Sequence, residues 1–97
     1  MTQVAVVATV KGLVGKEQQL KTELLKLVAP SRSDAGCLQY TLNQDPTTPN
    51  IFIFIERWES RKHLDDHCTQ PHFAAFVKNA TKLLAGPLEV KILDVLS

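Results

Sequence analysis

Three histidines, His63, His67 and His72, lie close together in the second half of the chain. Histidine titrates near neutral pH, so it can act as a general acid or base, a hydrogen-bond donor or a metal ligand. His63 and His67 are four residues apart on a predicted helix, so they share one face, and with the adjacent Asp66 they make a possible metal set. The pattern is weak, because the Glu that follows the first His in metalloproteases is missing and basic neighbours of His63 favour a solvated face. We predict no metal site.

His67 and His72 flank a break between two predicted helices at residues 68–71. A histidine at such a junction can point into the space between helix and sheet, where burial tunes its pKa. There it could act as a general base or a hydrogen-bond donor. Alternatively, either imidazole caps a helix end or bonds a backbone carbonyl. The residues alone leave both roles open, and His67 and His72 are the candidate catalytic residues.

Aromatic side chains concentrate in the central strands and the last predicted helix, which must meet across one sheet face. Phe73 and Phe76 are typical of a plain apolar core. Tyr40 and Trp58 each carry a polar group on the ring, so they are better candidates for a pocket wall with a hydrogen-bonding tip. The chain has no phosphate loop, nucleophile elbow, CxxC pair or dinucleotide fingerprint, and we expect no cofactor.

Composition sets the broad class. The chain has 97 residues, enough for a single domain over 1–97, with a formal charge of +1 and no basic stripe of the kind that nucleic acids require. No apolar run approaches the length of a membrane span, and no signal peptide is recognisable, so we expect a cytoplasmic protein that binds neither nucleic acid nor membrane. Cys37 and Cys68 do not form a disulfide framework and are expected to be reduced thiols.

Four segments have the composition of strands, namely 4–10, 37–43, 51–58 and 88–96. In the second segment Leu38, Tyr40 and Leu42 are expected to share one face. A turn-forming loop over 45–50 joins it to the third segment in an antiparallel hairpin. Glu56 and Arg57 in the third segment point to opposite faces, so one of them should be buried and held in an ion pair.

Three helices are predicted between these strands. The first begins after Gly15 and ends or kinks at Pro30; the second covers 61–68 with Ser60 as N-cap; the third is capped by Thr69. The apolar stripe of the third helix comprises Phe73, Phe76, Val77, Ala80 and Leu84. The order β-α-β-β-α-α-β predicts an α+β, ferredoxin-like fold, in which helices cover one face of an antiparallel four-stranded sheet.

The 51–58 strand is apolar on both faces, with Ile51, Ile53 and Ile55 on one side and Phe52 and Phe54 on the other. If all helices lie on one face, the other face exposes an apolar patch of the kind that marks an interface. We therefore expect a homodimer that packs sheet against sheet; a more twisted monomer that covers its own sheet is the alternative.

Several segments in their order and spacing are similar to the antibiotic biosynthesis monooxygenase family, and closest to its small quinol-monooxygenase-like members. The similar segments are Val7-Ala8-Thr9-Val10-Lys11, Gly15-Lys16-Glu17, Gly36-Cys37-Leu38-Gln39-Tyr40, Glu56-Arg57-Trp58-Glu59-Ser60, His67 and Pro71-His72-Phe73. The resemblance covers essentially the whole chain, and implies a dimeric α+β barrel with a substrate cavity between helices and sheet.

The resemblance also implies an activity, the oxidation of a quinol or polyphenol by O2 without metal, flavin or another cofactor. By resemblance, Trp58 and Tyr40 belong to the cavity wall, Asn43 and Phe54 are weaker lining candidates, and His67 and His72 handle protons. Haem-degrading relatives use an Asn on the first strand, and Val4 to Val10 contains none. A non-catalytic dimer that binds a small ligand or serves a stress response, and an isomerase of a small signalling metabolite, remain alternatives.

Overall fold

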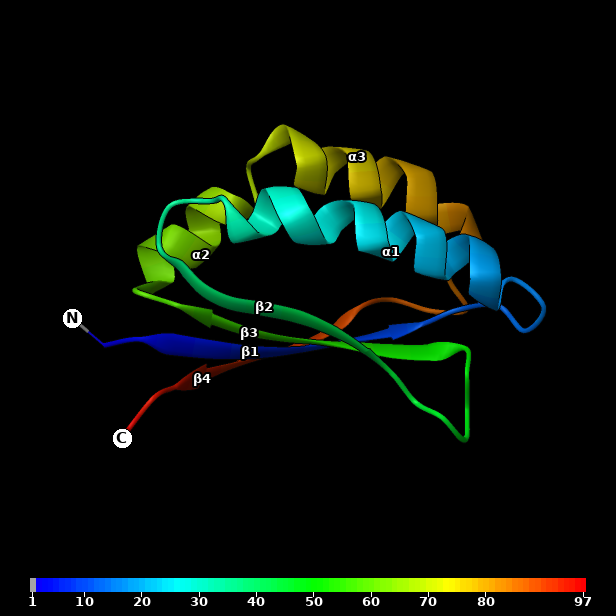
Figure 1. The fold of residues 1–97 in the computed structure, drawn as a ribbon, viewed down its shortest axis with the longest axis horizontal. Helices are drawn as coiled ribbons and strands as arrows, with labels where there is room; N and C mark the ends of the chain where they lie inside the picture. Colours follow the sequence, from blue (N-terminus) through cyan, green and yellow to red (C-terminus); the bar gives the residue numbers. More distant parts are fainter. Residues whose placement is uncertain (1) are drawn as a thin grey trace.

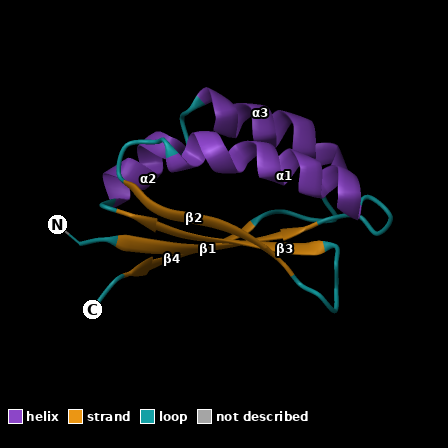
Figure 2. Cartoon of the chain, viewed as in Figure 1, coloured by secondary structure: helices purple, strands orange, loops and turns teal. Residues whose placement is uncertain are grey.

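The computed structural model describes residues 2–97, which form a four-stranded sheet covered on one face by helices (Figures 1 and 2). The elements in chain order are β1 (Val4–Lys11), α1 (Glu17–Arg32), β2 (Cys37–Gln44), β3 (Ile51–Trp58), α2 (Arg61–His67), α3 (Pro71–Ala80), a 3₁₀ turn (Thr81–Leu83) and β4 (Glu89–Asp94). Neighbouring strands are antiparallel, in the order β2-β3-β1-β4. The predicted ferredoxin-like α+β fold is confirmed.

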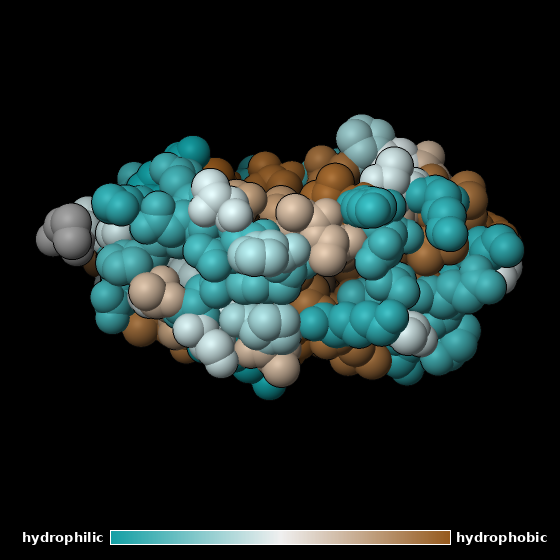
Figure 3. All heavy atoms as spheres, turned by 90° about the horizontal axis from the view of Figure 1, so that it is seen from above, coloured by the Kyte–Doolittle hydropathy of each residue, from teal (hydrophilic) through white to brown (hydrophobic). Residues whose placement is uncertain are grey.

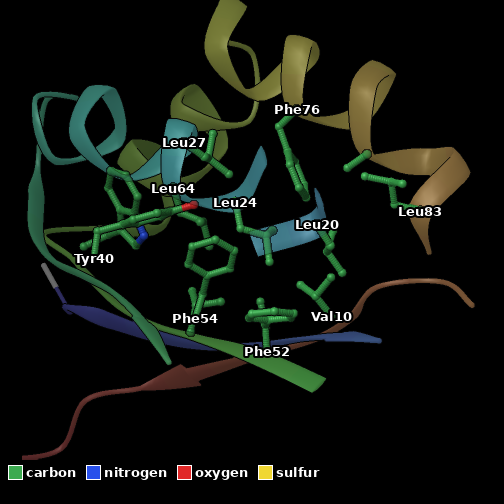
Figure 4. Close-up of a cluster of buried hydrophobic side chains, with 14 of the residues drawn as sticks. Val10, Leu20, Leu24, Leu27, Tyr40, Phe52, Phe54, Leu64, Phe76 and Leu83 are labelled. Atoms are coloured by element: carbon green, nitrogen blue, oxygen red, sulfur yellow. The ribbon is translucent and has the colours of Figure 1, made fainter. Parts of the chain in front are cut away.

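The core lies between the sheet and the helices. On β3 the side chains of Phe52, Phe54 and Trp58 face the helices and are at most 3% exposed. Phe52 and Phe54 rise from the strand towards the leucines of α1 and towards Phe76 of α3 (Figure 4). Strict alternation along β3 therefore places one parity, including Glu56, inside the molecule.

The other parity of β3 forms an uncovered sheet face. Ile51 and Ile53 are half-buried there and Ile55 is 43% exposed, beside Val7 of β1. Leu93 of β4 adds a further apolar side chain that is 44% exposed. The helices lie on the opposite side (Figure 1), so the structure assigns the isoleucines to the open face.

The edge strand β4 is exposed on its helix-facing side too. Val90 and Ile92 pair with the buried Ala8 and Val6 and so point to the helix side, yet they are 55% and 39% exposed. Seen from the helix side of the molecule, apolar atoms show between the hydrophilic ones (Figure 3). No helix in residues 2–97 is long and apolar enough to cross a membrane.

The first helix was predicted to end or kink at Pro30; it does not end there, but runs to Arg32 with Pro30 inside it. Pro30 lies in the last turn, where its missing N–H removes a single hydrogen bond. The backbone N–H groups of Ser33 and Asp34 then bond the carbonyls of Pro30 and Ser31 and close the helix end. The extra turn brings Asp34 to the ends of α2 and α3.

Three other local predictions were wrong. A β-bulge between Cys37 and Gln39 removes Leu38 from the buried face, so Leu38 is 46% exposed while Tyr40 is buried. Gln70, not Thr69, precedes α3, and the Thr69 hydroxyl donates to the carbonyl of Asp66 instead. Val77 is 45% exposed on α3.

The predicted start of α2 is confirmed. The Ser60 side chain accepts a hydrogen bond from the backbone N–H of His63. Gly36 lies against the His63 ring with φ of 79°, so a side chain at this position would be strained and would overlap the imidazole. This close approach fixes α2 against the start of β2 and holds His67 over the sheet.

Candidate active site

A cavity of about 70 Å³ lies between the sheet and the helices. Most of its lining is apolar, and its polar or titratable side chains are Tyr40, Glu56, His67 and Cys68. An apolar cavity of about 150 Å³ accommodates benzene, so an aromatic ring requires this cavity to widen. Val90 of the edge strand lines the cavity and is 55% exposed, which places the opening between β4 and α3.

Three helix ends meet beside this cavity and bring His67, Asp34 and His72 together. Asp34 follows α1, His67 is the last residue of α2, and His72 is the second residue of α3. His67 Nδ1 lies 2.7 Å from Asp34 Oδ2, and His72 Nε2 lies 2.8 Å from the same oxygen. An ionised carboxylate only accepts, so each imidazole directs an N–H at Asp34. In neutral His67 this leaves Nε2 as a proton acceptor.

The protonation of His67 follows from its burial. Its side chain is 2% exposed. Burial lowers the pKa of His67, and the hydrogen bond and negative charge of Asp34 oppose this shift. His67 is therefore a neutral base near pH 7, with an acidic partner placed to stabilise the imidazolium that forms when it accepts a proton.

Asp34, His67 and His72 are also the one group in residues 2–97 with three potential metal ligands, whose ligand atoms lie within 4.8 Å of one another. The set considered from the sequence, His63, His67 and Asp66, does not assemble. His63 Nδ1 lies 2.8 Å from Ser60 Oγ, and Asp66 pairs with Lys62 at 3.1 Å. At the Asp34 cluster a metal ion would have to displace the two N–H protons that His67 and His72 direct at the carboxylate.

The sequence reasoning missed Glu56 as a site residue. Glu56 lines the cavity, is 6% exposed, and accepts a hydrogen bond at Oε1 from Trp58 Nε1 at 2.9 Å. The expected ion pair is absent: Arg57 lies exposed on the other face, and no cation in residues 2–97 pairs with Glu56. Burial raises the pKa of Glu56 to about 7, and the Trp58 bond opposes this shift. The sequence did contain a signal for this position, because Glu56 alternates with Phe54 and Trp58 and therefore shares their face of the strand.

The remaining candidates fall into two groups. Tyr40 and Phe54 line the cavity, and the Tyr40 ring lies 5.5 Å from that of His67. Burial and the nearby Glu56 carboxyl raise the pKa of Tyr40. Trp58 is fully buried behind the lining, with its ring 4.7 Å from that of His67. Asn43 lies on the open sheet face and donates to the Ile53 carbonyl at 3.2 Å, outside the cavity.

The raised pKa of Glu56 makes folding depend on pH. The folded state holds this proton up to about pH 7, whereas an unfolded Glu releases it near pH 4.3. The folded state thus binds more protons in this window, so Glu56 lowers stability as pH rises through it. We expect Glu56→Gln to match the wild type near pH 4 and to be about 3 kcal/mol more stable at pH 8, measured by urea unfolding. A difference that does not change with pH would contradict this.

Comparison with known proteins shows which protein family the chain is similar to. The sequence profile of the antibiotic biosynthesis monooxygenase family matches residues 3–79. The uncharacterised protein sll1783 of Synechocystis is 35% identical over 92 residues, which cover 95% of this chain and 63% of that protein. YcnE of Bacillus subtilis, which carries a provisional monooxygenase name, is 32% identical over 75 residues. These residues cover 77% of this chain and 79% of YcnE. The crystal structure of PA3566 from Pseudomonas aeruginosa matches with a TM-score of 0.93 and 36% identity, covering 100% of this chain and 97% of that one.

Proposed function

Because the chain belongs to the antibiotic biosynthesis monooxygenase family, we propose that it oxidises a quinol or polyphenol with O2 in the cavity between sheet and helices, without a cofactor. The observation that carries this proposal is a buried base, His67, that lines an apolar cavity and is held by Asp34. A phenolate is a far better electron donor than a phenol, so removal of one proton is the step that the protein must promote.

In the proposed reaction His67 Nε2 accepts the proton of a substrate hydroxyl. The anion transfers an electron to O2, the two radicals combine at a ring carbon, and loss of water leaves a carbonyl. A quinol and one O2 then give a hydroxyquinone and one water, which balances both atoms and electrons. The apolar lining keeps bulk water from the reactive anion.

Asp34 and His72 are assigned different parts in this reaction. Asp34 positions His67 and stabilises its imidazolium through the 2.7 Å contact. His72 lies on the far side of Asp34, lines a separate groove rather than the cavity, and its side chain is 20% exposed. His72 is therefore assigned the role of orienting the Asp34 carboxylate, and it is the member of the cluster that reaches solvent.

We assign the open sheet face to a second copy of the chain. Ile51, Ile53, Ile55, Val7 and Leu93 form an apolar patch there, and burying each such side chain is worth about 1.5–3 kcal/mol. A homodimer that packs sheet against sheet leaves the helix side, with the cavity opening at Val90, accessible to a small aromatic molecule.

The direct test is O2 consumption by purified, chelator-treated protein with a panel of hydroquinones and polyphenols. We expect consumption of one O2 per quinol, above the rate of autoxidation. Binding of the same compounds without consumption would favour the ligand-binding alternative, and turnover under nitrogen would favour an isomerase. Either result would overturn the oxygenase proposal.

A further inference from the structure

Glu56 is a buried acid for which the reaction above has no use. One of its oxygens, Oε1, accepts the indole N–H of Trp58 at 2.9 Å, and no other side-chain hydrogen bond in residues 2–97 involves this carboxyl group, which leaves Oε2 without one. Because the side chain lines an otherwise apolar cavity, Oε2 is available to a molecule inside it. An unpaired acid in such surroundings is costly for folding, and polar groups placed this way in apolar pockets usually orient a ligand.

Glu56 is also the one cavity-lining group in the described chain that changes charge at about pH 7. Its pKa is raised to about 7 by burial. The pKa of His67, from α2, is lowered from 6.5, so His67 stays neutral in this range. The pKa values of Tyr40 from β2 and Cys68 after α2 are raised from 10.0 and 9.0 by burial and by Glu56 itself.

The other elements around Glu56 add no charge that faces it. Its neighbour on β1 is Val6, and the lining residues of α1 and α3 are Leu27, Phe73 and Phe76. Cys37 of β2 senses the Glu56 charge, and its pKa is raised by burial. Asp34 and His72 contact His67 from outside the cavity lining.

We propose that Glu56 binds an oxygen of the ligand and discriminates a quinol from a quinone by its own protonation state. The ionised carboxylate accepts a hydrogen bond from a quinol hydroxyl and repels a quinone carbonyl. The neutral acid donates to the carbonyl. The cavity therefore favours the reduced substrate above neutral pH and the oxidised product below it. The class of ligand in this inference rests on the proposed function. The titration of Glu56 is independent of that function.

The size of the effect follows from the fraction of Glu56 in each state. With a pKa of about 7, roughly nine-tenths of the side chain is neutral at pH 6 and roughly one-tenth at pH 8. A ligand that needs one state loses affinity in proportion to the fraction of that state. We expect the Kd of a quinone to rise about tenfold from pH 6 to pH 8, and the Kd of the matching quinol to fall about tenfold.

The test uses Trp58, the only tryptophan of the chain, as a fluorescent reporter. Duroquinone and its hydroquinone suit as probes, because their fully substituted rings neither alkylate Cys68 nor accept a new hydroxyl. Binding is titrated under nitrogen between pH 6 and pH 8 for the wild type and for Glu56→Gln. The Gln side chain keeps an acceptor for the Trp58 indole but cannot ionise. Without ligand, wild-type Trp58 emission should titrate near pH 7, and that of Glu56→Gln should not.

Opposite pH trends for the two probes, lost in Glu56→Gln, would support the inference. Equal pH dependence of both probes, or trends that persist in Glu56→Gln, would overturn it and leave the oxygenase proposal standing. If neither probe binds although Trp58 emission titrates near pH 7, both the discrimination and the quinol cavity fail, while the ionisation of Glu56 is retained.

Discussion

Replacing His67 by Asn should lower quinol-dependent O2 consumption by about 10² to 10⁴-fold, the usual contribution of a general base. The Asn amide nitrogen occupies the place of the imidazole Nδ1 and can still donate to Asp34, whose oxygen lies 2.7 Å away. The substitution removes Nε2, the atom assigned to accept the substrate proton. The measurement is the initial rate in an oxygen electrode, corrected for autoxidation.

The matched control is His63→Asn on the same helix. His63 contacts Ser60 and Gly36 rather than the cavity, so this variant should keep its activity. Circular dichroism would establish that both variants are folded. A folded His67→Asn protein with wild-type rates would exclude His67 as the base and leave Glu56 as the remaining cavity carboxylate for that role.

Replacing Ile55 by Lys should convert a dimer into a monomer. Ile55 is 43% exposed on the open sheet face, so the substitution costs the isolated protomer little. In a sheet-to-sheet dimer the same ammonium group would be buried without a partner, at a cost of several kcal/mol. The dimer Kd should therefore rise by at least about 100-fold, measured by light scattering across a dilution series.

Val77→Lys supplies the control for charge alone. Val77 is 45% exposed on α3, on the opposite side of the sheet (Figure 1). Its replacement should therefore leave the dimer mass measured by light scattering unchanged. A wild-type protein that is monomeric at micromolar concentration, or an Ile55→Lys protein that remains dimeric, would contradict the assignment of the open face.

Most of the fold could be predicted because hydrophobic periodicity records which face of each element is buried. Both parities of β3 are apolar, and the structure places Phe52 and Phe54 against the helices and Ile55 on the open face. Errors arose where a local feature breaks the period. The bulge at Leu38 shifts one residue out of phase, and Pro30 fits inside α1 because it lies in the last turn.

The candidate site was less accessible to sequence reasoning. Periodicity and resemblance pointed to Tyr40, Phe54 and His67, which line the cavity. Asp34 was missed because it lies in a loop 33 residues from His67, and no sequence period links them. Glu56 was expected to form an ion pair, since an unpaired buried acid is rare outside functional sites. Only the three-dimensional structure reveals that no cation within residues 2–97 forms an ion pair with it.

The most direct test of the oxygenase proposal is isotope labelling with ¹⁸O2. Chelator-treated protein is incubated with 1,4-naphthohydroquinone, which has an open ring position, and the product is analysed by mass spectrometry. The proposed reaction predicts a hydroxynaphthoquinone that carries one ¹⁸O atom, with the second atom in water, and a loss of this product in His67→Asn. A hydroxylated product without label, or labelled product formed equally fast without the protein, would contradict it.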